Sequence, residues 1–309
     1  MNNIEKCYQT IKTDCFSFFR KEETKSERFN NKKKMLKKIL IPLCFWIINK
    51  NKNLSRTLFL GISGGQGSGK TTITKLLKII LSKYFKKKVC TMSIDDFYKT
   101  LDERQKLSKK KHFLLKTRGI PGTHDINFIF NLMNNLKKNF FIRTHMPKFD
   151  KSIDDRLKKN KWQKITKKPD IIILEGWCIG AKPQMFSKLK KPVNELEKYE
   201  DKKMIWRNFA NSNLKRSYKK LFSKIDEIIF LKVPNFSLIT KWRLKQEKKL
   251  NLKNKLAKNK KIMSHSEVLR FVMFYERITL QMFLDLPKIA SVVMCLNNNH
   301  EIKKVYYNN

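Results

Sequence analysis

The sequence predicts an α/β fold in which a mostly parallel, doubly wound sheet is flanked by helices. Short apolar segments alternate along the chain with longer segments of helical periodicity, the pattern that builds such a sheet. The first apolar segment, 57–62, runs into a glycine-rich loop, and the apolar residues after that loop recur at helical spacing. A strand, a glycine loop and a helix in that order indicate the first crossover of this fold.

Five segments are predicted to be strands because they are short, apolar and rich in β-branched residues. They span residues 57–62, 89–94, 171–174, 227–233 and 290–296. Since these strands are expected to be parallel, ligands should bind where their carboxyl ends meet.

Residues 1–52 are predicted to form a Lys-rich N-terminal extension with one amphipathic helix, at 35–48. An apolar stripe on this segment is expected to pack against the core; it consists of Leu36, Ile39, Leu40, Leu43 and Ile47. A helix lying on a membrane surface is the alternative, but Pro42 interrupts the basic face. The remaining residues, 53–309, are predicted to form the main domain.

Near the C-terminus, Ser264 and Glu267 form a capping box that should open a helix running to about residue 284. The preceding stretch, 248–261, is rich in Lys and Asn and has weak periodicity, so we expect a mobile lid loop. Plain disorder is an equally permitted interpretation.

The net charge of +44 suggests a polyanion partner, but the basic residues are spread along the whole chain. Only 12 of the 70 basic residues are Arg, so each Arg is a candidate for a role that needs a planar guanidinium. No apolar run approaches the roughly 18 residues of a membrane span, and the six scattered cysteines predict neither disulfides nor a zinc site. We therefore expect a cytoplasmic protein with no membrane partner; the sequence leaves its oligomeric state open.

The loop GGQGSGKT at 64–71 is a complete phosphate-binding loop in the required context. Its glycines let backbone N–H groups approach phosphate oxygens, and the N-terminus of the next helix adds further donors. Lys70 is expected to reach the β- and γ-phosphates, and the Thr71 hydroxyl to ligate Mg²⁺. The expected nucleotide-binding residues are Gly64, Gly65, Gln66, Gly67, Ser68, Gly69, Lys70, Thr71 and Thr72.

Acidic residues follow two of the predicted strands. Asp95 and Asp96 end the segment 89–94, and Glu175 ends the segment 171–174. One of the two aspartates could accept a proton from an attacking hydroxyl while the other holds water around Mg²⁺. Glu175 is expected to be a metal partner. Turn formation by the aspartates and helix capping by Glu175 are the structural alternatives.

Together the segments GGQGSGKT, SIDDFY and IILEG resemble the phosphoribulokinase, uridine kinase and pantothenate kinase group of small-molecule kinases. Narrower motifs resemble the plant-type D-glycerate 3-kinases and their bacterial relatives, in collinear order over roughly residues 40–300. These motifs are RGIPGTHD at 118–125, PKFDKS at 147–152 with DDR at 154–156, EGWCIG at 175–180, PVNELE at 192–197 and WRLKQE at 242–247.

The resemblance implies phosphorylation of D-glycerate to 3-phosphoglycerate with ATP and Mg²⁺. It implies that Lys70 and Thr71 contact nucleotide and metal and that Asp95 is the base. It also implies that Glu175 is the Glu of the Glu-Gly pair that ends the motif IILEG. It also implies that Arg243 reaches over the transferred phosphate from a lid helix, with the lid region at about 235–263. Residues 53–309 would then be the kinase domain, while residues 1–35 have no counterpart.

The acceptor motifs are also cationic, as a hydroxy-carboxylate substrate requires. We expect Arg118 or Arg156 to bind the substrate carboxylate and Asp125 to bind a hydroxyl. Lys148 and His124 are further candidates, although a lone His in a turn is often structural. Two rival functions remain at this point: a kinase for another small hydroxylated metabolite, and a nucleic-acid-dependent ATPase, which the acceptor motifs disfavour. A degraded kinase is disfavoured because Lys70 and the other expected catalytic residues are intact.

Overall fold

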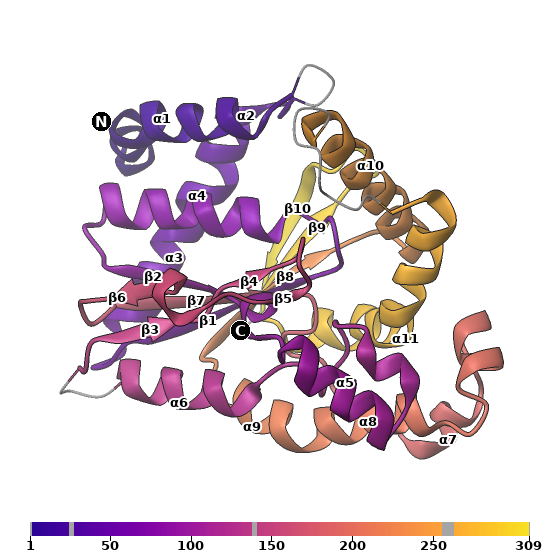
Figure 1. Cartoon of the computed structure of the whole chain (residues 1–309). Helices are drawn as coiled ribbons and strands as arrows, with labels where there is room; N and C mark the ends of the chain where they lie inside the picture. The colour runs from indigo at the N-terminus through magenta and orange to yellow at the C-terminus, as the bar shows by residue number, and fades with distance from the viewer. Residues whose placement is uncertain (1, 25–27, 138–140, 255–262, 309) are drawn as a thin grey trace.

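A six-stranded sheet with the order β10-β9-β8-β1-β7-β2 forms the centre of the computed structural model (Figure 1). The structure describes residues 2–24, 28–137, 141–254 and 263–308. The strands of this sheet are β1 (Leu58–Gly64), β2 (Val89–Ser93), β7 (Ile171–Gly176), β8 (Glu227–Lys232), β9 (Val292–Leu296) and β10 (Ile302–Tyr307). The strands β2, β7, β1, β8 and β9 pair in parallel, so the expected sheet and its five strands are confirmed.

The sequence did not predict β10, which pairs antiparallel with β9 at the edge of the sheet. Its sequence, IKKVYY, is exposed or only partly buried, so it lacks the apolar run that marks strands such as β7 and β9.

Helices cover both faces of the sheet because successive side chains of each strand point to opposite faces (Figure 1). In β1, Leu58, Leu60 and Ile62 join a core cluster with α1, α3, α4 and α10, whereas Phe59 joins a second cluster with α6, α8 and α11. The main helices are α1 (Asn3–Glu22), α3 (Ile41–Lys52), α4 (Lys70–Lys83), α5 (Leu101–Lys110), α6 (Ile126–Lys137), α8 (Ile205–Asn213), α10 (Phe236–Asn254) and α11 (His265–Ile289).

Short elements connect these layers and carry several of the expected site residues. The short strands are β3 (Thr144–Met146), β4 (Phe149–Asp150), β5 (Asp155–Arg156) and β6 (Gln163–Ile165). The short helices are α2 (Lys32–Met35), η1 (Leu36–Leu40), η2 (Ile94–Phe97), η3 (Phe113–Lys116), η4 (Lys159–Lys161), α7 (Phe186–Lys190), η5 (Leu196–Glu200), η6 (Leu214–Tyr218) and α9 (Lys219–Phe222).

The N-terminal extension is more helical than the sequence predicted. The expected helix is present as α2, η1 and α3, and Pro42 lies at the start of α3, where a missing N–H costs little. A second helix, α1, was not predicted; its buried stripe includes Cys7, Ile11, Cys15 and Phe19. The α1 stripe relies on two cysteines within a strongly polar segment, which hid its periodicity. Both helices pack against α4 and the sheet in one core cluster.

The lid segment also differs from the expectation. Helix α10 continues to Asn254, so the first half of the predicted loop at 248–261 is helical, and residues 255–262 lie outside the described part of the chain. The predicted capping box is confirmed, since Ser264 Oγ accepts from Glu267 N and the Glu267 side chain accepts from Ser264 N. The helix it opens ends at Ile289, beyond the expected residue 284.

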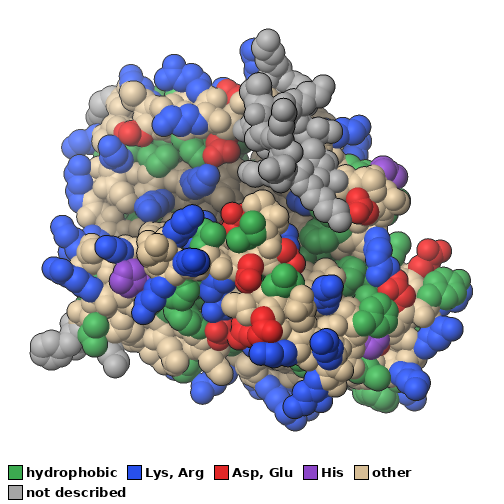
Figure 2. Space-filling view, in the orientation of Figure 1, with side chains coloured by type: hydrophobic (Ala, Val, Ile, Leu, Met, Phe, Trp, Pro, Cys, Tyr) green, Lys and Arg blue, Asp and Glu red, His purple; other side chains and the backbone are tan. Residues whose placement is uncertain are grey.

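Basic side chains are spread over the face shown in Figure 2, while acidic side chains gather toward its middle (Figure 2). None of the helices in the described ranges combines the length and the apolar character that a bilayer crossing would need.

Candidate active site

The glycine-rich loop joins β1 to α4 at the carboxyl edge of the sheet. Gly67 and Gly69 have φ angles of 73° and 89°, which side chains with a Cβ rarely adopt. Lys70 Nζ donates to the carbonyls of Gly64 and Gly65, each at 2.9 Å, and therefore folds back across the loop. Burial lowers the pKa of Lys70, and the negative charges of Glu175 and Asp95 oppose this shift.

Two buried hydroxyls near this loop have no hydrogen-bond partner among the residues described, namely those of Ser63 and Ser68. Buried hydroxyls are normally paired, so the two groups point to a polar ligand. Phosphate oxygens, which accept hydrogen bonds from backbone N–H groups at a helix N-terminus, are a ligand of this kind.

The Thr71 hydroxyl donates to Glu175 Oε1 at 3.0 Å, which joins the start of α4 to the end of β7. In the sheet Glu175 lies beside Ile62 of β1 and Ser93 of β2, at the shared carboxyl edge of three parallel strands. Burial raises the pKa of Glu175, and the charge of Lys70 counteracts this shift.

The Thr71 and Glu175 side chains supply hard oxygen donors, as a magnesium site requires. Within the described ranges, no group of three or more His, Cys, Asp or Glu side chains could hold a metal by itself. The arrangement therefore fits a divalent ion that takes its remaining ligands from phosphates and water, which is how Mg²⁺ is usually bound beside a phosphate loop.

Asp95 lies in η2, directly after β2, where Ser93 Oγ accepts from its backbone N–H. Its carboxylate accepts from Tyr98 Oη at 2.9 Å and pairs with Lys151 Nζ at 2.6 Å. Burial alone would raise the pKa of Asp95, but the charge and hydrogen bond of Lys151 outweigh burial and hold that pKa well below its usual range. Asp95 is therefore ionised, close enough to Lys70 and Glu175 to influence both.

Asp96 points to a different part of the structure. Its carboxylate pairs with Lys148 Nζ at 3.2 Å and accepts from Phe149 N at 3.2 Å, and burial raises its pKa. These contacts anchor the β4 segment to η2. They favour a structural role for Asp96 over the expected metal-binding role, and they make Asp95 the better candidate for the base.

The expected acceptor cations lie around Tyr98, and each has an acidic partner. Arg156 donates to the Tyr98 carbonyl at 2.8 Å and lies 3.6 Å from the Asp125 carboxylate. Asp125 also accepts from Phe128 N, so it caps helix α6. Arg118 pairs with Asp154, and its guanidinium lies 5.5 Å from the Phe149 ring centroid.

Arg104, which the sequence did not single out, lies beside these groups. Its side chain is fully buried, donates to the carbonyls of Lys99 at 3.2 Å and Lys116 at 2.7 Å, and shares the Asp154 carboxylate with Arg118. The rarity of Arg in this Lys-rich chain was the available signal. It was not decisive, because Arg104 stands in a charged segment, LDERQKLSKK, that predicts an exposed helix.

Comparison with known proteins gives the family. Residues 59–184 match the profile of the phosphoribulokinase/uridine kinase family. An uncharacterized kinase of Schizosaccharomyces pombe, mug58, is 33% identical over 232 residues, which are 71% of this chain and 79% of that protein. The chain belongs to the phosphoribulokinase/uridine kinase family. It is a P-loop kinase, and this family implies ATP together with a divalent metal ion.

Two further relatives of this kinase carry a more specific name. A chloroplastic D-glycerate 3-kinase of Arabidopsis thaliana is 31% identical over 198 residues, 62% of this chain but only 41% of that protein. The solved structure of a D-glycerate 3-kinase from Cryptococcus neoformans var. grubii superposes with a TM-score of 0.72 at 24% identity, covering 87% of this chain and 99% of that one. The second likeness confirms the fold, and the expectation of an ATP-dependent kinase is confirmed at the level of the family.

In this kinase helix α10 lies directly on the phosphate loop. A Cβ added at Gly65 would overlap Ile239 Cδ1, and one added at Gly67 would lie 3.0 Å from Trp242 Cβ. Arg243 follows on the same helix, pairs with Glu247 and lies 5.2 Å from the Phe271 ring centroid. The structure thus brings the expected lid arginine near the loop, held by contacts within α10 and with α11.

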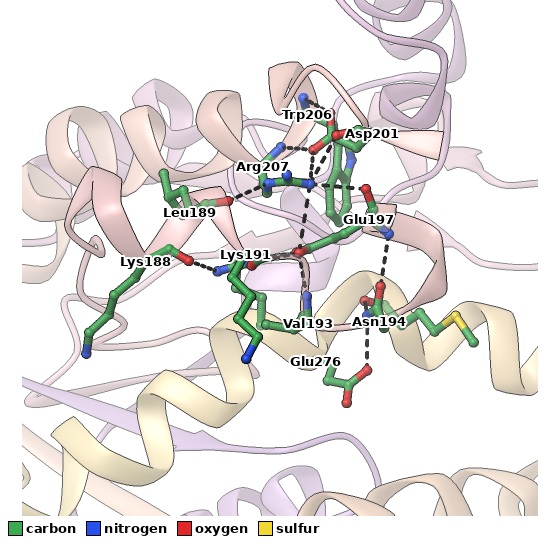
Figure 3. A network of polar contacts seen from close by, with 12 residues as sticks. Lys188, Leu189, Lys191, Val193, Asn194, Glu197, Asp201, Trp206, Arg207 and Glu276 are labelled. Atoms are coloured by element: carbon green, nitrogen blue, oxygen red, sulfur yellow. Dashed lines mark hydrogen bonds and ion pairs between the residues drawn. The ribbon is translucent and has the colours of Figure 1, made fainter. Parts of the chain in front are cut away.

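A buried ionic network accounts for another motif, PVNELE at 192–197 (Figure 3). Glu197 pairs with Arg277 of α11 at 2.6 Å, and Arg207 of α8 pairs with Asp201 at 3.3 Å and donates to the Glu197 carbonyl at 3.1 Å. Asn194 donates to the Glu276 carboxylate at 3.0 Å. These contacts fasten α11, on which α10 packs, to the segment between α7 and α8, so the motif is structural.

Proposed function

We propose that this kinase transfers the γ-phosphoryl group of ATP to the 3-hydroxyl of D-glycerate by in-line displacement, with Mg²⁺ as the divalent ion. The observation that carries this proposal is the meeting of Asp95 with the Lys70–Thr71–Glu175 group at the carboxyl edge of the sheet. The similarity to the Arabidopsis D-glycerate 3-kinase supports the choice of acceptor.

On the nucleotide side, the backbone N–H groups of residues 64–71 would hold the phosphates. Lys70 would exchange its two loop carbonyls for phosphate oxygens, which are stronger acceptors because they are charged. Thr71 and Glu175 would hold the metal ion, directly or through water. When bound, the ion neutralises charge that develops on the phosphate oxygens.

On the acceptor side, the substrate carboxylate requires a guanidinium, and both Arg118 and Arg156 remain candidates. Each is paired with an Asp that a bound carboxylate would compete with. Arg104 also holds Asp154, so Arg118 can turn to the substrate without leaving Asp154 unpaired. Lys148 pairs with Asp96, and Asp125 caps helix α6. These contacts weaken the substrate-binding roles expected of Lys148 and Asp125.

Asp95 would orient the attacking hydroxyl and accept its proton. The new bond forms between that oxygen and the γ-phosphorus as the bond to the β-phosphate oxygen breaks, so ADP leaves. Because phosphoryl transfer has a loose transition state, little proton transfer is needed before the old bond breaks. A carboxylate that stays ionised, as Asp95 does, suits this orienting role.

The test is ADP release in a coupled assay with Mg-ATP and D-glycerate, compared with L-glycerate, glycerol, uridine, pantothenate and no acceptor. We expect turnover with D-glycerate and a product that NMR identifies as the 3-phosphate. Asp95→Asn, a near-isosteric change, should lower that turnover about 10²- to 10⁴-fold. Turnover with a different acceptor, or hydrolysis that needs none, would contradict the proposal.

A further inference from the structure

His124 is buried beside the expected acceptor-binding residues, between two tyrosines. The imidazole is 2% exposed, stacks on Tyr98 with ring centroids 4.4 Å apart, and meets Tyr218 edge-on. Its Nδ1 is 2.5 Å from Tyr218 Oη. Its Nε2 has no hydrogen-bond partner among the residues that the structure describes.

The protons around Tyr218 can be assigned by counting donors and acceptors. Tyr218 is fully buried, and its Oη already accepts from Gly122 N at 3.1 Å. Burial raises the pKa of Tyr218 well above its ordinary value, so the phenol keeps its proton. If His124 Nδ1 carried a proton, the phenol proton and the Nε2 lone pair would both lack a partner. If the phenol donates to Nδ1, only the Nε2–H remains unpaired, which is the less costly arrangement.

The ring itself is neutral. Burial lowers the pKa of His124 to about 4, although the charge of Asp95 opposes the shift. Two charged neighbours bear on the ring, Asp95 and Lys99. A neutral imidazole leaves the Asp95 carboxylate available for a substrate hydroxyl, whereas an imidazolium would place a second positive charge near it besides Lys151.

We propose that Tyr218 fixes His124 as the tautomer protonated at Nε2, and that this N–H donates a hydrogen bond to an oxygen of the bound acceptor. His124 would then contact the substrate as a neutral donor, and Tyr218 would be a positioning residue that the sequence analysis did not name. The hydrogen bond from His124 to the acceptor rests on the proposed function, whereas the tautomer of His124 does not. A buried N–H without a partner is unfavourable, and an oxygen of the bound acceptor would satisfy it.

The tautomer is tested by ¹⁵N NMR of the histidine-labelled full chain at pH 7, without nucleotide or acceptor. The His124 signals are identified by their loss in His124→Gln. We expect a protonated-type shift for Nε2 and an unprotonated-type shift for Nδ1. A proton on Nδ1, or an imidazolium, would overturn the proposal.

Tyr218→Phe should turn the single His124 tautomer into a mixture, whereas Tyr199→Phe, at a ring that is 57% exposed, should leave it unchanged. A His124 tautomer that stays at Nε2 in Tyr218→Phe would show that the phenol does not fix it. Because these spectra need no acceptor, they decide the tautomer even if D-glycerate is not a substrate.

The contact with the acceptor is tested by steady-state kinetics with D-glycerate. His124→Gln places an amide N–H near the position of Nε2, whereas His124→Asn places its amide near Nδ1. We expect Asn to raise the KM for D-glycerate about tenfold, the size of one lost hydrogen bond, with the KM for ATP unchanged. Gln should restore most of the affinity. Equal KM values for the two variants would refute the donor role, and absence of D-glycerate turnover in the wild type would refute the proposed function instead.

Discussion

Replacement of His124 by Gln is expected to flatten the pH dependence of the free energy of unfolding in acid. The ordinary pKa of His is 6.5, and burial lowers that of His124 to about 4 in the folded protein. Between these values the unfolded chain binds a proton that the folded chain does not, so stability falls as the pH falls. The loss approaches about 1.4 kcal/mol per pH unit between the two pKa values, which gives roughly 2 kcal/mol from pH 6.5 to pH 4.5.

The assay is urea unfolding followed by tryptophan fluorescence at pH 7 and pH 4.5. The loss of stability between the two pH values should be smaller in His124→Gln than in the wild type by about 2 kcal/mol. His265→Gln is the matched control, because that side chain is exposed at the start of α11, and it should behave as the wild type. An equal loss in His124→Gln and in the wild type would show that the imidazole is not buried in its neutral form.

Four further substitutions test the rest of the reasoning. Asp95→Asn should lower kcat about 10²- to 10⁴-fold in the coupled assay, with ATP affinity by calorimetry unchanged; a wild-type kcat would rule out Asp95 as the base. Arg243→Ala should also lower kcat by orders of magnitude without weakening ATP binding, and an unaltered kcat would remove Arg243 from the transfer step. Gly65→Ala should cost about 1–3 kcal/mol in urea unfolding because its Cβ overlaps Ile239, and adding Ile239→Val should recover part of that loss; no recovery would mean that α10 does not rest on the loop. Arg207→Met should cost about 3–5 kcal/mol because it removes the arginine partner of the buried Asp201 carboxylate, and a thermal midpoint equal to that of the wild type would show that the network is not needed for stability.

Several features of the fold were predictable because their signals are local. Strands such as β7 and β9 carry apolar runs, and Ser264 with Glu267 marks the start of α11 within four residues. Helix α1 and strand β10 were missed because neither shows a clear apolar pattern in the sequence. Exposed residues in adjacent pairs break the alternation in β10, and cysteines replace aliphatic residues in the buried stripe of α1.

By itself the sequence determined the phosphate loop, the order of strands and helices, and the acids that follow β2 and β7. These depend on residue type and spacing along one element, and parallel strands necessarily bring their carboxyl ends together. Only the tertiary structure decided which charges pair: Asp95 with Lys151, Asp96 with Lys148, and Arg118 with Asp154. It also placed Tyr218 against His124, 94 residues away in the chain. Such pairs are set by how loops from different elements pack over the sheet edge, and no periodicity within one segment encodes that packing.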